Sequence, residues 1–355
     1  MINKITIRNF KSLESVDVNL KKINVLIGPN GSGKTAFVES LLLSRNIISK
    51  LLGYSPFGMW WGYENVVYKR DTSRSIVVEF NSDEFYYTFK VNGDAPKFIA
   101  EYVKFKDLEI DRAENIVQIN GKKVADTLKT DYSIFSPFNL VKLGEKVADS
   151  LSYVLNYISN IIILHINPSD AISPVHSTEP TVLNINGRGM TKILHNLYLE
   201  GKLPGFLEEF LEEEGYSISF RISDEGNIIL YFNDNGTIIP PPSVPSGLVK
   251  MLTILTAISL KPKVLAIDEI ENSLHLKYIE RLLDILDNFS NDTQIILTTH
   301  SPLVIDLVKP SDLIILYKEG SSTKIRRVNK KDEELRNYLV EKGITLSDAY
   351  FYGVL

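Results

Sequence analysis

The sequence predicts an α/β fold in which a mainly parallel core sheet carries an antiparallel β lobe and a helical lobe. Three observations predict it. Residues 23–43 have the pattern of a strand, a glycine-rich turn and a helix. Residues 75–129 contain short runs of alternating polarity, which are typical of antiparallel strands. Residues 246–317 alternate apolar strands with helices, the pattern of a parallel sheet that is covered on both faces.

The composition is that of a soluble globular protein. Hydrophobic residues make up 44% and charged residues 23% of the 355 positions, and the chain is long enough for one elaborated domain or two. The net charge of −5 gives no overall attraction to nucleic acid or to an anionic membrane. The absence of cysteine excludes disulfides, thiolate metal sites and cysteine nucleophiles.

No segment of the sequence is expected to enter a membrane. Residues 1–5 lack the apolar stretch and the small-residue cleavage site of a signal peptide. Residues 151–166 are apolar but too short to span a bilayer, and Asn156, Ser159 and Asn160 interrupt them. We therefore expect a cytoplasmic protein that does not bind membranes.

The first elements lead into the glycine-rich turn and the antiparallel lobe. Strands are expected at residues 4–10, 15–20 and 23–27, followed by a helix that ends near Leu52. The aromatic loop 53–62 either stacks on a base or a partner or folds under itself, and we favour the second. The antiparallel strands are expected at residues 76–80, 85–91, 102–105 and 116–119, with turns at Asn92-Gly93 and Asn120-Gly121.

The second half is expected to build the helical lobe and complete the core. The predicted helices are residues 143–158, two within 188–214, 246–260, 277–289 and one at the carboxyl terminus. The predicted strands are residues 161–164, 217–220, 228–232, 264–267, 294–297 and 313–317.

The turn at residues 28–35, Gly-Pro-Asn-Gly-Ser-Gly-Lys-Thr, matches the phosphate-binding motif G-x-x-x-x-G-K-[ST]. Such a turn aims backbone N–H groups and a helix N-terminus at an anion. Lys34 is expected to bind the β- and γ-phosphates of ATP, and the Thr35 hydroxyl to bind Mg²⁺. The alternative is a glycine-rich turn without a ligand. The other residues expected around the phosphates are Asn30, Gly31, Ser32 and Gly33.

Residues 264–269 form an apolar strand that ends in two carboxylates, the Walker B pattern of a P-loop protein. Asp268 is expected to hold the Mg²⁺ shell, and Glu269 to orient and deprotonate the attacking water. Neighbouring residues on a strand point to opposite faces, so both can act only if the strand ends there. The alternative is an ordinary turn at the end of a strand.

A third strand ends in a histidine, in the stretch 294–302. Ligands of open parallel sheets bind at the carboxyl ends of the strands, so His300 is expected to sense the γ-phosphate or hold the attacking water. The alternative is a structural histidine. His275 and His300 do not have the spacing of metal ligands.

Together these motifs resemble the ABC-type ATPase head of the RecF, SMC and OLD group, over essentially the whole chain. The stretches that carry the resemblance are RNFKSL at 8–13, NVLIGPNGSGKT at 24–35, IDEIENSLH at 267–275 and TTHSP at 298–302. The resemblance implies one composite ATPase domain over residues 1–355. Its parts are the P-loop with the antiparallel lobe at 1–135, the helical and signature lobe at 136–260, and the rest of the core at 261–355.

The resemblance also implies an ATP-dependent head-to-tail homodimer in which each subunit offers a signature helix to the γ-phosphate of its partner. The residues expected to do so are Ser246 and Gly247, because a serine hydroxyl and a helix N-terminus suit an anion. The stretch departs from the fuller LSGGQ form, and Ser246 as an ordinary N-cap is a compatible alternative. A Q-loop glutamine is also missing, since Gln118 lies beside an Asn-Gly turn.

Other departures narrow the resemblance to stand-alone OLD-like "AAA family" ATP-binding proteins, which often work with a separate partner. No segment is long enough for the coiled-coil arms of SMC-like proteins. The stretch after His300 is too short for the Toprim nuclease domain of full OLD proteins, so we expect no intrinsic nuclease.

Two functions follow from these observations. The first is a Mg²⁺-dependent ATPase in DNA repair or anti-phage defence, in which ATP binding closes the dimer and hydrolysis opens it. The second is a slow ATP-gated switch that regulates a separate effector or toxin partner. A small-molecule kinase is disfavoured by the pair Asp268-Glu269 and by His300.

DNA binding would need a local basic patch. The marked basic cluster is Lys324, Arg326, Arg327, Lys330 and Lys331. A solvated hairpin is favoured there over a DNA contact, because three acidic residues at 332–334 follow at once.

Overall fold

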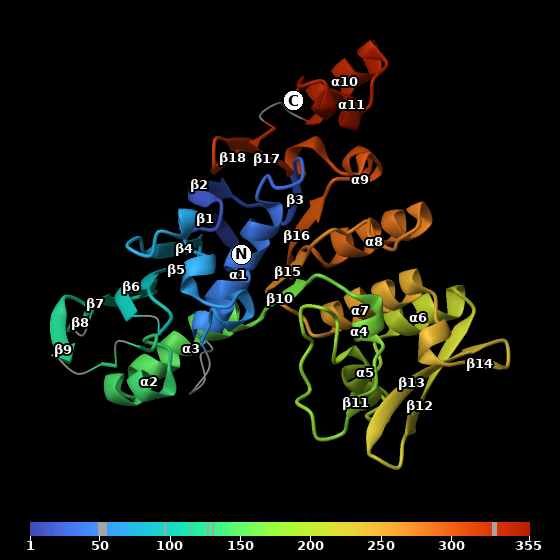
Figure 1. The fold of residues 1–355 in the computed structure, drawn as a ribbon, viewed down its shortest axis with the longest axis horizontal. Helices are drawn as coiled ribbons and strands as arrows, with labels where there is room; N and C mark the ends of the chain where they lie inside the picture. The colour runs from blue at the N-terminus through green and yellow to red at the C-terminus, as the bar shows by residue number, and fades with distance from the viewer. Residues whose placement is uncertain (49–54, 96, 115, 126–127, 130, 329–331) are drawn as a thin grey trace. The chain divides into compact units, whose positions relative to one another are not determined.

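The computed structural model describes residues 1–48, 55–95, 97–114, 116–125, 128–129, 131–328 and 332–355. It divides into two compact units (Figure 1). Unit 1 comprises residues 1–161 and 294–355, and unit 2 comprises residues 162–293. The boundaries expected at residues 135 and 260 differ from this division, and the single composite domain stays a prediction.

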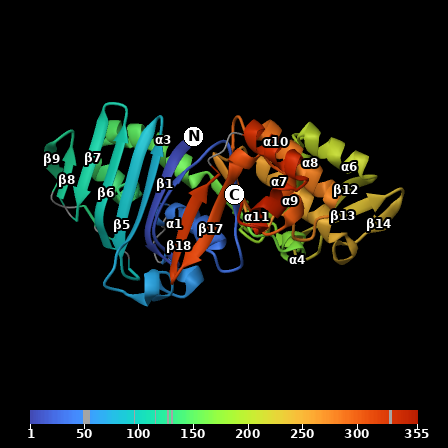
Figure 2. The same cartoon turned by 90° about the horizontal axis from the view of Figure 1, so that it is seen from above.

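Unit 1 contains the antiparallel lobe, in which the strands lie in the order β2-β1-β4-β5-β6-β7-β8-β9. Figure 2 shows β5, β6, β7, β8 and β9 in this order. Alternation of buried and exposed side chains, as at Ile76, Val78 and Phe80, explains why these segments form a sheet with one apolar face. The bounds are β1 Ile2–Phe10, β2 Leu13–Asn19, β4 Ile76–Ser82, β5 Phe85–Asn92, β6 Lys97–Phe105, β7 Leu108–Ala113, β8 Ile116–Ile119 and β9 Lys122–Ala125.

Two strands of this lobe, β7 and β9, and the helix α2 (Pro137–Leu143) were not expected from the sequence. The exposed face of β7 carries Glu109 and Asp111, and its buried face carries Arg112. Because charged residues occur on both faces, the sequence does not show the alternation of apolar and polar residues that is typical of a strand. Short charged segments become strands because a neighbouring strand supplies the hydrogen bonds, and that pairing depends on the fold rather than on local propensity.

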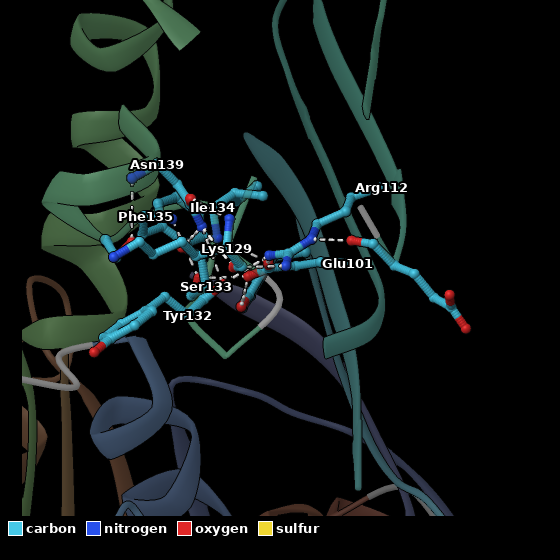
Figure 3. Close-up of polar contacts among 11 residues, drawn as sticks. Glu101, Arg112, Lys129, Tyr132, Ser133, Ile134, Phe135 and Asn139 are labelled. Carbon is cyan, nitrogen blue, oxygen red and sulfur yellow. Dashed lines mark hydrogen bonds and ion pairs between the residues drawn. The ribbon is translucent and has the colours of Figure 1, made fainter. Parts of the chain in front are cut away.

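Arg112 is the largest fully buried side chain in the described residues, and it forms an ion pair with Glu101 on the neighbouring strand β6 (Figure 3). The Glu101 carboxylate also accepts hydrogen bonds from the Tyr87 and Ser133 hydroxyls and from the Ile134 amide. Burial raises the pKa of Glu101, whereas Arg112 and these donors oppose the rise. The satisfied network stabilises the charges inside the lobe.

The same network holds the segment that precedes α2. Arg112 Nη1 donates to the Tyr132 carbonyl at 2.7 Å, and Arg112 Nη2 donates to the Lys129 carbonyl at 3.0 Å. Asn139 in α2 donates to those two carbonyls and to the Ser133 carbonyl. An apparently irregular segment is thus fixed by two buried polar side chains.

Unit 1 also contains the parallel strands β16, β3 and β17, in that order, with β18 antiparallel to β17. β3 and β16 are buried along nearly all of their length, as expected of strands with helices on both faces. The bounds are β3 Ile23–Ile27, β16 Gln294–Thr299, β17 Leu313–Glu319 and β18 Ser322–Arg327. The other α-helices of this unit are α1 Lys34–Ile48, α3 Glu145–Ser159, α9 Pro302–Leu307, α10 Asp332–Lys342 and α11 Leu346–Phe351.

Unit 2 contains the neighbouring strands β10 and β15, a sheet in the order β11-β13-β12 with β14 paired to β13, and a set of helices. The strands are β10 Ile161–Leu164, β11 Val175–His176, β12 Tyr216–Ile222, β13 Asn227–Asp234, β14 Thr237–Ile239 and β15 Val264–Ile267. The helices are α4 Pro168–Ala171, α5 Met190–Leu199, α6 Gly205–Glu213, α7 Ser246–Ser259 and α8 Leu276–Phe289. β10 and β15 are fully buried, as their continuous apolar runs predict.

Short 3₁₀ helices fill several loops. Three of them, η1 Gly58–Trp60, η2 Tyr63–Asn65 and η3 Tyr68–Arg70, follow α1, and the others are η4 Pro241–Ser243 and η5 Pro310–Asp312. In the aromatic loop Phe57 is fully buried and Trp60 donates to Glu39, so the expectation that the loop folds under itself is confirmed for these two residues. Trp61 is 91% exposed, so the same expectation is wrong for Trp61.

Some sequence predictions fall outside the described residues. These are the end of the first helix near Leu52, Gly53 and Tyr54 of the aromatic loop, and Lys330 and Lys331 of the basic cluster. Lys324, Arg326 and Arg327 lie in β18, which forms the expected hairpin with β17. Arg327 donates to the Asn19 and Ser311 carbonyls, so its guanidinium has a structural role. None of the helices in the described residues has the length and apolar character needed to cross a bilayer.

Candidate nucleotide site

The glycine-rich turn lies between the end of β3 at Ile27 and the start of α1 at Lys34. Gly33 has φ +108°, a backbone conformation that residues with a Cβ rarely adopt. A Cβ built on Gly33 would lie 2.4 Å from the Thr323 hydroxyl oxygen, which itself donates to the Ser32 carbonyl at 2.9 Å. The loop is therefore held from behind by β18, and only glycine fits at this position.

At the start of α1, Lys34 is buried and Thr35 is exposed. Lys34 is 8% exposed, and its ammonium donates to the Gly28 carbonyl at 2.7 Å and to the Pro29 carbonyl at 3.3 Å. The Lys34 ammonium therefore lies against the glycine-rich loop, at the N-terminus of α1. Both the positive charge and the helix N-terminus favour an anion there. Thr35 is exposed, so its hydroxyl is accessible to a ligand. Ser32 carries a buried hydroxyl with no hydrogen-bond partner in the described residues.

His300 lies beside the glycine-rich turn. β16 runs parallel to β3 with Thr299 opposite Ile27, so the next residues, His300 and Gly28, leave the sheet at the same level. A cavity of about 410 Å³ contains both of them. The residues that line it are Gly28, Pro29, Asn30, His300, Ile305, Tyr350 and Phe351. The sequence did not point to Tyr350 and Phe351, although an aromatic run at residues 350–352 was visible in it.

The two carboxylates of residues 268 and 269 lie in unit 2. β15 ends at Ile267, which meets the requirement that the strand end before both of them. Asp268 is 3% exposed and its amide donates to the Leu164 carbonyl at 2.8 Å. Glu269 has φ +53°, so the backbone turns sharply there. The side chains of Asp268 and Glu269 are therefore not bound to the alternating directions that neighbouring residues have on a strand.

His165 is a neighbour of Asp268 that the sequence interpretation missed. Its Nδ1 lies 3.2 Å from Asp268 Oδ2, and this hydrogen bond raises the pKa of His165. A signal was present, because His165 follows the buried strand β10 just as Asp268 follows β15. The edge rule that selected His300 selects His165 equally.

Ser246 and Gly247 begin the helix α7. Pro245 occupies the N-cap position without a side-chain hydrogen bond, so the alternative in which Ser246 is the N-cap is wrong. Ser246 is exposed in the first turn of the helix, where backbone N–H groups have no intrahelical acceptor. A Cβ on Gly247 would lie 2.9 Å from the Ser273 carbonyl oxygen, so the helix start packs directly on the turn that follows Asp268.

Lys250 joins the same helix to the same turn. It is 2% exposed, and its ammonium donates to the Glu269 carbonyl at 2.8 Å and to the Asn272 carbonyl at 2.7 Å. Burial lowers the pKa of Lys250 to about 8, against the attraction of the carboxylates of Glu271, Glu269 and Asp268.

The predicted site residues therefore fall into two groups. Unit 1 brings together Asn30, Gly31, Ser32, Gly33, Lys34, Thr35 and His300, and unit 2 brings together Ser246, Gly247, Asp268 and Glu269. The glutamines noted in the sequence are in structural positions, since Gln118 lies in β8 and Gln294 bonds to the backbone of Ile2 and Lys21.

A protein-family model described as "AAA domain, putative AbiEii toxin, Type IV TA system" matches residues 23–306. The matched residues start with β3 and end within α9. They therefore include both groups of predicted site residues, whereas Tyr350 and Phe351, which line the same cavity as His300, lie outside the matched residues.

A curated relative is the Endonuclease GajA of Bacillus cereus (strain VD045), which is 24% identical over 361 residues. The alignment covers 91% of this chain and 59% of GajA. The chain thus spans less than two thirds of the length of that relative.

Two solved structures share the fold. The SmcHead bound to the C-winged helix domain of ScpA has a TM-score of 0.56 at 16% identity, covering 94% of this chain and 99% of that chain. The Pyrococcus furiosus Smc head domain with an extended coiled coil, bound to the C-terminal domain of ScpA, has a TM-score of 0.52 at 13% identity, covering 96% and 98%. At these identities the likeness concerns the fold, and it confirms the predicted α/β fold class.

Proposed function

We propose that this chain hydrolyses ATP with Mg²⁺. The chain belongs to the AAA domain family that matches residues 23–306, and it is an ABC-type ATPase head of the RecF, SMC and OLD group. One observation carries the proposal. A glycine-rich turn with a buried lysine lies between a parallel strand and a helix, and the adjacent strand delivers His300 to the same cavity. This arrangement binds phosphates at the carboxyl edge of a sheet.

The residues fit the triphosphate. Gly33 lets the loop adopt φ +108° close against Thr323, and the Ser32 hydroxyl is buried without a partner in the described chain. We assign Lys34 to the β- and γ-phosphates, since its ammonium exchanges two loop carbonyls for phosphate oxygens at little cost. The backbone amides of residues 30–33 complete the cradle.

The donor set also fits Mg²⁺, which prefers oxygen ligands. We assign the Thr35 hydroxyl and the Asp268 carboxylate to the metal, which would neutralise charge on the phosphates when bound. Glu269 orients and deprotonates the attacking water, and His300 contacts the γ-phosphate or that water. Each role belongs to the chemistry of phosphoryl transfer, which depends on positioning and charge rather than on a covalent intermediate.

We further propose an ATP-dependent head-to-tail homodimer in which Ser246 and Gly247 face the γ-phosphate held by the partner. Support comes from the exposed Ser246 at the start of a long helix, where unpaired N–H groups favour an anion. A role in DNA repair or anti-phage defence is supported by the relatives, one of which is described as an endonuclease and one family as a toxin.

The alternative function is a slow ATP-gated switch that regulates a separate effector. The family description, which includes a toxin–antitoxin system, favours it. Both functions require ATP to bind, and they differ in whether turnover is fast without a partner.

The test compares phosphate release from ATP and oligomeric state in the parent protein and in Glu269→Gln. The parent protein is expected to hydrolyse ATP with Mg²⁺, and Glu269→Gln to bind ATP as a stable dimer while turnover falls about 100-fold or more. Glu280→Gln, an exposed carboxylate on α8, is the matched control and is expected to keep the parent rate. A Glu269→Gln protein with the parent rate, or a phosphorylated small-molecule product, contradicts the assignment.

The same assay separates the two functions. Turnover is measured alone, with duplex DNA and with proteins that co-purify in ATP from the native host. A rise with DNA supports a repair-type role, whereas a rise only with a co-purifying protein supports the switch.

A further inference from the structure

Lys250 is a buried charged residue, and the proposed reaction assigns it no role. We propose that it is a positioning residue, which fixes the catalytic turn 268–272 to the start of α7 so that Ser246 and Glu269 move as one piece. The inference rests on the proposed function, and it concerns how the site is regulated by the partner copy of this chain.

The contacts that carry the inference lie in the first turns of α7. Ser246 and Lys250 are four residues apart and therefore share one face of the helix. Gly247, between them in sequence, brings the helix backbone against Ser273, where a Cβ would lie 2.9 Å from the carbonyl oxygen. Lys250 completes the junction with its two hydrogen bonds of 2.8 and 2.7 Å to the Glu269 and Asn272 carbonyls.

The turn needs such a partner. Glu269 has φ +53° and Ser273 has φ +62°, a backbone conformation that residues with a Cβ rarely adopt. The carbonyls of Glu269 and Asn272 accept partly buried hydrogen bonds from a side chain that is itself only 2% exposed, and loss of that donor would leave both acceptors without it. An ammonium can donate to both at once, and its charge offsets the carboxylates of Asp268, Glu269 and Glu271 around it.

The consequence concerns communication between sites. In the proposed dimer the start of α7 meets a phosphate bound to the partner copy, whereas Glu269 acts on the ATP of its own chain. A rigid junction at Lys250 transmits the position of Ser246 to the Glu269 backbone. Lys250 therefore makes hydrolysis at one ATP respond to occupation of the other, through the start of α7, the Lys250 side chain and one turn.

Lys250→Met tests the role, and Lys192→Met is a matched control. Lys192 in α5 of the same unit is also buried, at 8% exposure, and also donates to two carbonyls, those of Ser177 and Glu179. For Lys250→Met we expect kcat to fall on the order of 10- to 100-fold, as for a displaced catalytic group, with KM for ATP within about 2-fold of the parent. Lys192→Met is expected to leave both constants unchanged.

A double-mutant cycle with Glu269→Gln distinguishes positioning from general loss of structure. If Lys250 acts through Glu269, then Lys250→Met has no further effect on the residual rate of Glu269→Gln. Lys250→Gln, whose amide satisfies one of the two carbonyls, is expected to show the same fall in kcat and serves if Lys250→Met does not fold.

The outcomes are distinct. An unchanged kcat in a folded Lys250 variant, an equal loss in Lys192→Met, or a fully additive cycle overturns the inference while leaving the ATPase intact. Failure of the parent protein to hydrolyse ATP removes the proposed function and this inference with it.

Discussion

The guanidinium of Arg112 lies 3.1 Å from the carboxylate of Glu101, and neither side chain is exposed to solvent. The pair joins β6 to β7 and, through the Lys129 and Tyr132 carbonyls, fixes the segment that leads to α2 (Figure 3). Removal of one member leaves a buried charge without its partner, and this is more costly than loss of the pair as a whole.

Arg112→Met is therefore expected to lower the free energy of unfolding by about 3 to 5 kcal/mol, measured by chemical denaturation. The control is Glu109→Gln on the same strand, which faces Lys104 at an exposed position and is expected to change stability by less than about 0.5 kcal/mol. Equal effects of the two substitutions would show that the buried network does not stabilise the lobe.

Gly33→Ala is expected to abolish ATP binding. The new Cβ would meet the Thr323 hydroxyl oxygen at 2.4 Å at a residue with φ +108°, so the loop must leave the conformation that forms the phosphate cradle. Gly320→Ala is the control, because Gly320 has φ +61° but open space around it, and it is expected to lower stability by about 1 kcal/mol without loss of binding. Calorimetric titration with ATP checks both variants, and normal affinity in Gly33→Ala would contradict the assigned cradle.

Lys34→Met is expected to weaken ATP binding by about 10- to 100-fold, the effect of losing hydrogen bonds made by a charged donor. Titration of a fluorescent ATP analogue measures it. Lys22→Met, an exposed lysine just before β3, keeps the net-charge change equal and is expected to bind normally. Similar losses in both variants would mean that net charge, rather than the Lys34 ammonium, governs affinity.

His165→Ala is expected to raise the Mg²⁺ concentration needed for half-maximal turnover by about 10-fold or more, because partners of metal-binding carboxylates orient them. The physical reason is the 3.2 Å contact between His165 Nδ1 and Asp268 Oδ2. His176→Ala in the same unit removes a histidine that contacts Thr178 and the Glu225 carbonyl instead. An unchanged Mg²⁺ requirement in His165→Ala would show that Asp268 is oriented without it.

The strands and helices with strong patterns were predictable. The continuous apolar runs became the buried strands β3, β15 and β16, and the motif at residues 28–35 became the turn between β3 and α1. These features depend on local sequence, because an apolar run, a set of glycines and a helix start impose their own backbone geometry. The segment β7 was not predictable, since Arg112 finds its partners, Glu101 and the Lys129 and Tyr132 carbonyls, only within the folded lobe. The short elements β9 and α2 were missed as well.

The candidate site divides in the same way. The residue types and their order along the chain selected Lys34, Thr35, Asp268, Glu269 and His300. They did not select His165, Lys250, Tyr350 or Phe351, whose importance lies in contacts with residues far away in sequence. A lysine in an apolar helix has no signal of its own until the two carbonyls that it meets are known.

The sequence by itself determined that a phosphate-binding turn, a strand ending in two carboxylates and a strand ending in histidine occur in one chain, because short motifs carry their own chemistry. Only the tertiary structure decided that Thr323 closes the back of the turn at Gly33 and that Lys250 fastens the turn after Asp268 to α7. The physical reason is that hydrogen bonds and close packing act through space, between groups that no sequence spacing brings together.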